Sequence, residues 1–145
     1  MSRIFALLVA SIISLSFTVS AKAVDLPISW AHNGSAMLLT NDGLGLFTIE
    51  YSDPSNAIRG AGVRRGTVLI RGYVNNNYRV TGTARVFKLG CDGEEYLVSG
   101  SVSRNGDTYY MNLTGAAPVF GPGCSISGRA YNRNSDLMFV GGWHD

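Results

Sequence analysis

Residues 30–35 (WAHNGS) place a histidine, an asparagine and a serine within six positions, and these residue types could form a hydrolytic site. Nucleophilic catalysis needs a base within hydrogen-bond distance of the nucleophile, a group that orients the base, and donors for the oxyanion. The flanking signatures of known hydrolases, such as G-x-S-x-G, are absent from the sequence. We therefore interpret Trp30 as a core residue and Asn33 and Gly34 as a turn. A small hydrolase that uses His32 is kept as an alternative.

The sequence lacks the other common catalytic and cofactor-binding patterns. Glu94 and Glu95 are adjacent, so they would point to opposite faces of a strand and could not work as a paired acid and base. No phosphate loop or dinucleotide fingerprint occurs. Two thiols and two distant histidines lack the paired short spacings of a structural zinc site. We therefore predict a protein that is not an enzyme and has no cofactor or metal.

The first 23 residues have the pattern of a secretory signal. Arg3 supplies a positive charge, residues 4–19 form an apolar run, and residues 21–23 (AKA) match an A-x-A cleavage site. The apolar run is short for a membrane span of about 20 residues. We predict cleavage after Ala23 and a mature domain of residues 24–145 that is periplasmic or secreted, without stable membrane insertion.

The charge of the mature domain argues against nucleic acid as a partner. Of the 12 Lys and Arg residues, Arg3 and Lys22 lie in the predicted signal, which leaves ten basic residues against ten acidic ones. Arg64 and Arg65 form too small a basic cluster to hold a phosphate backbone. We therefore expect no nucleic-acid binding.

Cys91 and Cys124 are the only cysteines in the chain. In an exported protein they are expected to form a disulfide. Closing a loop of roughly 34 residues would contribute about 3–4 kcal/mol in the chain-entropy model. Residues 94–103 and 108–115 between them read as two strands joined at Asn105 and Gly106, so the bond is expected to tie together the ends of a β-hairpin.

Alternation of apolar and polar residues recurs along the mature chain and predicts strands. Phe47, Ile49 and Tyr51 share one face of the segment 44–52, which is the expected core face. The segment 78–87 alternates most regularly, and its core face is expected to hold Tyr78, Val80, Gly82, Ala84 and Val86. Further strands are expected at 67–74, 94–103, 108–115, 124–131 and 136–142, with an irregular loop over 53–66.

These patterns predict an all-β protein with a single domain over residues 24–145. We expect a small antiparallel β-barrel of about eight strands, mainly in meander order, or a closed sandwich. A barrel of this size is filled by its own side chains or holds one small ligand. An outer-membrane barrel is not expected, because Arg79, Arg85 and Ser99 lie on the outward faces.

Three segments, residues 28–37 (ISWAHNGSAM), 62–70 (GVRRGTVLI) and 78–87 (YRVTGTARVF), together with the two cysteines, resemble a group of small exported proteins of alphaproteobacteria. That resemblance covers nearly the whole mature chain. It implies export and carries no known activity.

Residues 127–131 (SGRAY) resemble the S-G-x-x-Y motif of periplasmic inhibitors of c-type lysozyme. Those inhibitors are small signal-bearing barrels with a disulfide. Their second motif ends in Lys-Gly near the C-terminus and has no counterpart here, because no lysine follows Lys88. The resemblance implies a protein partner that cleaves the cell wall.

We therefore expect a non-enzymatic binding module whose partner is a muramidase-type enzyme of the cell envelope, which it would inhibit or regulate. Arginine pairs with carboxylates and tyrosine supplies contact area, so these types suit a carboxylate-lined cleft. A carrier with a hollow barrel that holds a small ligand is the main alternative. The candidate binding residues are Ser127, Arg129, Tyr131, Arg64, Arg65, Trp30 and His32.

Overall fold

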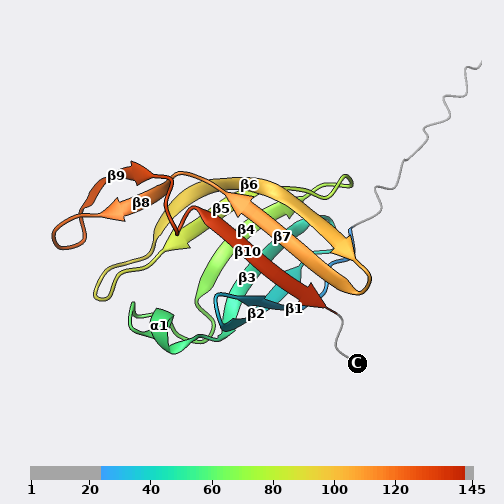
Figure 1. Ribbon diagram of the computed structural model, residues 1–145, viewed down its shortest axis with the longest axis horizontal. Coiled ribbons are helices and arrows are strands. Elements are labelled where there is room, and N and C mark those ends of the chain that lie inside the picture. The colour runs from blue at the N-terminus through green and yellow to red at the C-terminus, as the bar shows by residue number, and fades with distance from the viewer. Residues whose placement is uncertain (1–23, 143–145) are drawn as a thin grey trace, which may run out of the picture.

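The computed structural model describes residues 24–142, and most of them lie in β-strands (Figure 1). The predicted signal segment, residues 1–23, and His144 lie outside the described residues.

Eight strands form a closed antiparallel barrel in the order β1-β10-β7-β6-β5-β4-β3-β2. Consecutive strands pair with one another, and β10 closes the barrel against β1. The prediction of a small antiparallel barrel in meander order is confirmed. The barrel strands are β1 (Ser29–His32), β2 (Ser35–Asn41), β3 (Leu46–Asp53), β4 (Val68–Val74), β5 (Arg79–Val86), β6 (Glu94–Asn105), β7 (Thr108–Thr114) and β10 (Asp136–Gly142).

A separate two-stranded hairpin, β8 (Ala117–Phe120) and β9 (Ile126–Ala130), interrupts the meander between β7 and β10. A strand does occur within the predicted segment 124–131, but the prediction that it belongs to the barrel is wrong. β9 lacks an apolar face that could enter the barrel, and Pro118 in β8 has no N–H for a central ladder. β1 and β2 complete the eight barrel strands instead.

Two smaller predictions also differ from the structure. The loop over 53–66 contains one helical turn, α1 (Asn56–Arg59), which is too short to leave a helical period in the sequence. Tyr78, expected in the core, is exposed because it ends the β4–β5 turn with a φ of +58°. Val80 and Ala84 on the same predicted face are buried.

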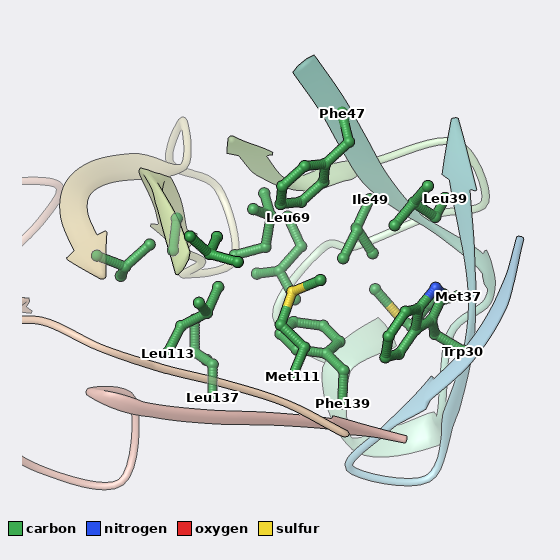
Figure 2. Close-up of a cluster of buried hydrophobic side chains, with 14 of the residues drawn as sticks. Trp30, Met37, Leu39, Phe47, Ile49, Leu69, Met111, Leu113, Leu137 and Phe139 are labelled. Atoms are coloured by element: carbon green, nitrogen blue, oxygen red, sulfur yellow. The ribbon is translucent and has the colours of Figure 1, made fainter. Parts of the chain in front are cut away.

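The interior of the barrel is filled by apolar side chains from every strand (Figure 2). Ile49, Met111 and Phe139 are fully buried, and the Trp30 Nε1–H donates to the Pro27 carbonyl at 2.7 Å. A bulge where β3 meets β4 leaves Leu69 without a partner, so both Leu69 and Ile70 turn inward. Burying one such side chain contributes roughly 1.5–3 kcal/mol, so this filled core holds the barrel together.

The two ends of the barrel differ in their connections. One end has the short turns 42–45, 75–78 and 106–107. The other end, called here the loop end, has the long connections 54–67, 87–93 and 115–135 and the tight turn at Asn33 and Gly34. Figure 1 shows α1 and the β8–β9 hairpin together at this end. The strands therefore carry the irregular parts of the chain to one place.

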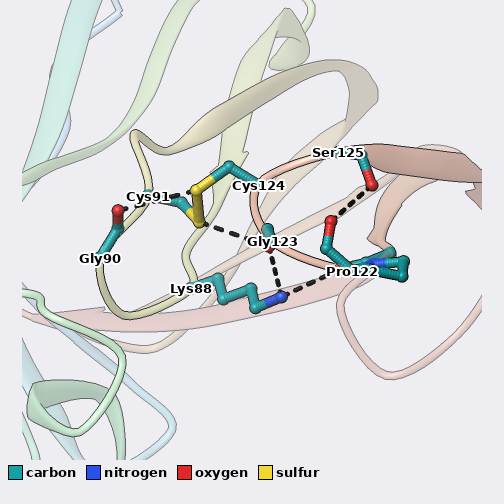
Figure 3. The surroundings of a disulfide bond; sticks show 8 residues. Lys88, Gly90, Cys91, Pro122, Gly123, Cys124 and Ser125 are labelled. Carbon is teal, nitrogen blue, oxygen red and sulfur yellow. Dashed lines mark hydrogen bonds between the residues drawn. A yellow bond between two sulfur atoms is a disulfide. The ribbon is translucent and has the colours of Figure 1, made fainter.

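The disulfide joins two connections at the loop end (Figure 3). Cys91, in the β5–β6 connection, bonds to Cys124, in the β8–β9 turn, with an S–S distance of 2.05 Å. The Lys88 ammonium donates to the carbonyls of Gly121, at 3.0 Å, and Gly123 in the same turn. The predicted disulfide is confirmed, but it anchors the tip of a projecting hairpin and does not close the β6–β7 hairpin.

Replacing both cysteines (Cys91→Ser with Cys124→Ser) should lower the free energy of unfolding by about 4 kcal/mol, since the unfolded chain regains the entropy of an open loop. Hydrogen exchange should rise first in β8 and β9, while β4 stays protected. Lys88→Met is the matched control, because it removes the bonds to Gly121 and Gly123 but keeps the disulfide. An equal loss of protection in β4 would show that the bond holds the barrel itself.

Phe139→Ala should lower the free energy of unfolding by about 3–5 kcal/mol, because it leaves a cavity in the filled core. Met138→Ala, one residue earlier with its side chain 58% exposed, should change it by less than about 0.5 kcal/mol. Urea unfolding followed by tryptophan fluorescence measures both. Similar losses for the two variants would contradict the inward and outward alternation of β10.

Candidate functional site

Six of the seven candidate binding residues lie at the loop end, and Trp30 lies in the barrel core. The loop end has three recesses, which differ in their lining and charge.

The first recess, called here the mouth cavity, opens at the end of the barrel beside α1 and has a volume of about 590 Å3. Polar side chains from six strands and from the connections between strands line it, together with an apolar wall. The lining includes His32, Ser35, Tyr51, Arg85, Tyr96, Arg133, Asn134, Asp136, Ile58, Leu69 and Leu137.

His32 is buried at the edge of the mouth cavity, and both of its ring nitrogens are engaged. Nδ1–H donates to the Met138 carbonyl at 2.8 Å, and Nε2 accepts from the Asn33 amide at 3.2 Å. The ring stacks on Phe139 with centroids 4.5 Å apart. Burial lowers the pKa of His32 below its usual 6.5, and the bond to the Met138 carbonyl offsets part of this effect. His32 is thus a neutral residue that ties β1 to β10.

Ser35 does not pair with His32 as a nucleophile would. Its Oγ accepts a hydrogen bond from the Ser55 N–H at 3.0 Å, which fixes the start of α1. A catalytic base would offer one ring nitrogen to the serine hydroxyl. The contacts of His32 and Ser35 are those of two buried structural residues.

Tyr51, on β3, and Tyr96, on β6, both line the mouth cavity. Burial raises the pKa of each phenol to about 12; Tyr96 adds to the effect on Tyr51, and Asp136 adds to that on Tyr96. The Tyr96 hydroxyl donates to the Asn134 carbonyl and so holds the connection before β10 against the barrel. Both phenols are therefore neutral hydrogen-bond donors at physiological pH.

The second recess, called here the hairpin groove, lies between β9 and the outer face of β6 and has a volume of about 730 Å3. Leu97 is 80% exposed and Tyr131 is 77% exposed, and both line it. The Arg129 guanidinium also lines it, donates to the Glu95 carbonyl at 3.4 Å and lies 3.9 Å from the Glu94 carboxylate. The groove thus combines two exposed apolar side chains with a cation.

Ser127 does not line this groove with Arg129 and Tyr131, the other two candidate residues of the segment 127–131. A bulge in the β8–β9 pairing falls at this position. The Ser127 Oγ donates to the Val119 carbonyl at 3.1 Å across the hairpin. The bulge therefore separates Ser127 from the other two residues.

The third recess, called here the arginine cleft, lies between residues 61–68 and residues 85–93 and has a volume of about 590 Å3. Arg64, Arg71 and Arg85 line it, beside Cys91. The Arg64 guanidinium donates to the carbonyls of Arg59 and Val63, at 3.2 and 3.0 Å, so it stabilises its own loop. Arg65 is exposed and makes no side-chain hydrogen bond or ion pair with the residues described.

Sequence reasoning did not single out Tyr51, Tyr96, Arg85 or Leu97 as site residues. A tyrosine on a core face near a strand end carries a usable signal, because its ring can be buried while its hydroxyl reaches the rim. Leu97 is an apolar residue on an outward face, and such a residue marks a contact surface only where a neighbouring element makes a recess beside it.

Comparisons with family models, curated proteins and solved structures identify no similar protein. Within residues 24–142, no cluster of three or more His, Cys, Asp and Glu side chains is placed to hold a metal ion. The same part of the chain has no helix long and apolar enough to cross a membrane.

The stability of the fold should decrease as the pH falls below 6.5. The folded protein holds His32 neutral, whereas the unfolded chain takes up a proton near pH 6.5, so acid favours unfolding. His32→Asn keeps a donor for the Met138 carbonyl but does not titrate, so its unfolding midpoint in urea should change less between pH 7.5 and pH 5. An equal loss of stability between pH 7.5 and pH 5 in both proteins would show that other groups cause the pH dependence.

Proposed function

We propose that this protein is an exported, non-enzymatic binding module that holds a protein partner of the cell envelope in the hairpin groove. The disulfide supports an oxidising compartment, where such bonds persist. The observation that carries the proposal is the pairing of Leu97 and Tyr131, two large apolar side chains exposed beside one recess. Large apolar and aromatic residues of this kind anchor protein interfaces.

The construction of the hairpin suits this role. The disulfide, the Lys88 ammonium and the Arg129 guanidinium each tie β8–β9 to the barrel side of the molecule. A surface that is already ordered loses little conformational entropy when a partner binds. The partner would therefore meet a preformed groove.

The class of partner that we propose is a muramidase-type enzyme, which this protein would inhibit or regulate. Support comes from the likeness of residues 127–131 to the motif of lysozyme inhibitors. Arg129 is held by two long hydrogen bonds and a 3.9 Å ion pair, so it can turn to a carboxylate of an enzyme cleft. Tyr131 and Arg129, and not the inward-bonded Ser127, would make the contact.

A carrier with a hollow barrel, the main alternative from the sequence, gains no support from the fold. The core side chains fill the interior, and Phe139, Met111 and Ile49 have no exposed surface (Figure 2). A small ligand would therefore have to bind in a surface recess and not in the barrel interior.

Tyr131→Ala and Leu97→Ser should each weaken partner binding about 30-fold, since truncating a central anchor costs about 2 kcal/mol. Tyr73→Ala is the matched control, because Tyr73 is exposed on β4, away from the groove. The measurement is capture of envelope proteins on the immobilised mature protein, followed by affinity for the captured muramidase and inhibition of its activity. Capture of no envelope protein and inhibition of no muramidase would refute the proposal.

A further inference from the structure

The mouth cavity contains a polar group that neither the core nor the proposed protein interface uses. Tyr51 is only 3% exposed, and its hydroxyl has no hydrogen-bond partner among residues 24–142. The same hydroxyl is not sealed inside the protein, because no buried and unpartnered side-chain atom occurs in this part of the chain. The Tyr51 hydroxyl therefore faces the space of the mouth cavity, which Tyr51 lines.

The Tyr51 hydroxyl is accessible from the cavity, so a molecule that enters the cavity can accept its hydrogen bond. The Tyr96 hydroxyl, by contrast, already donates to the Asn134 carbonyl. The pKa of Tyr51 is raised to about 12, so its hydroxyl keeps its proton at any physiological pH. Tyr51 is thus positioned to donate to an acceptor atom that enters the cavity.

The charges of the cavity favour an anion. Arg85 is half-buried, and within the described chain no carboxylate lies within 4 Å of its guanidinium. Its contacts are a 3.4 Å bond to the Val68 carbonyl and the face of the Phe87 ring, 5.2 Å away. Arg133 has no ion pair in this part of the protein either. Asp136 is the carboxylate in the lining, and it accepts a hydrogen bond from the Thr114 hydroxyl. Two arginines and one aspartate give the lining a net charge of one positive unit.

The rest of the lining suits an apolar body. Ile58, Leu69 and Leu137 face the cavity together with Phe87. A volume of about 590 Å3 lies within the range of small-molecule sites, which are mostly apolar with a few placed polar groups. The apolar wall and the free donor thus line the mouth cavity, and Arg85 lies between this cavity and the arginine cleft, since it lines both.

We propose that the mouth cavity binds a small organic monoanion with an apolar body. The anionic oxygen accepts a hydrogen bond from the Tyr51 hydroxyl and is paired by Arg85, while the apolar part rests against Leu69 and Leu137. Tyr51, Arg85, Leu69 and Leu137 do not line the hairpin groove, so the proposal does not depend on the protein partner.

The fluorescent monoanion anilinonaphthalene sulfonate has this chemistry and can be titrated into the folded mature protein. It should bind at one site, and Tyr51→Phe and Arg85→Gln should each weaken it about tenfold, the usual effect of a lost hydrogen bond to a charged group. The uncharged analogue phenylnaphthylamine should bind more weakly and should not respond to Arg85→Gln. Leu97→Ser in the hairpin groove is the control and should leave the affinity unchanged.

Melting temperatures of the variants distinguish a lost ligand contact from a damaged fold. Tyr51→Phe removes a hydroxyl without a partner, so its melting temperature should match that of the natural sequence. Tyr96→Phe is the matched comparison, because it breaks the bond to Asn134 and should lower the melting temperature. The proposal is overturned if the monoanion does not bind, or if Tyr51→Phe and Arg85→Gln leave its affinity unchanged. It is also overturned if Leu97→Ser abolishes binding.

Discussion

The structure depends on the closure of the barrel by β1, a strand of only four residues that pairs with both β10 and β2. Trp30 makes this closure possible, because its buried ring lies directly over Gly141 on β10. A Cβ at Gly141 would lie 2.6 Å from the ring, so only glycine fits there. Closure leaves the barrel without an exposed edge, and it brings His32 at the end of β1 against Phe139. The mouth cavity is therefore built on the same seam that closes the fold.

The barrel strands could be predicted where they alternate over many residues. Phe47, Ile49 and Tyr51 are buried as their spacing indicated, since a strand that packs on one face must bury every second residue. β1 could not be recognised, because four residues before a turn carry too little pattern, and it is the pairing with two neighbours that makes them a strand. β9 could be recognised as a strand but not placed, because alternation does not say which sheet a strand joins.

The candidate site could be predicted only in part, for a related reason. Sequence reasoning selected Ser127, Arg129 and Tyr131 from a predicted strand and the other candidates from the segments 30–35 and 53–66. A meander gathers its long connections at one end, so six of the seven selected residues lie together there. Contacts between distant segments decided what each residue does: Ser127 bonds to Val119 at a bulge, and Arg64 bonds to its own loop. Leu97 became part of a recess only because the β8–β9 hairpin lies beside it. Single-strand patterns do not contain such information.

The two recesses that we assign to binding share a wall. Tyr96 lines both the mouth cavity and the hairpin groove, and its hydroxyl holds the carbonyl of Asn134. Tyr131 lines the groove at the start of the same short connection, whereas Arg133 and Asn134 line the cavity. A molecule that displaces this connection in one recess must alter the other, and the coupling free energy would be equal in both directions. Tyr96 and the residue 131–135 connection are therefore the part of the structure that the two proposed sites have in common.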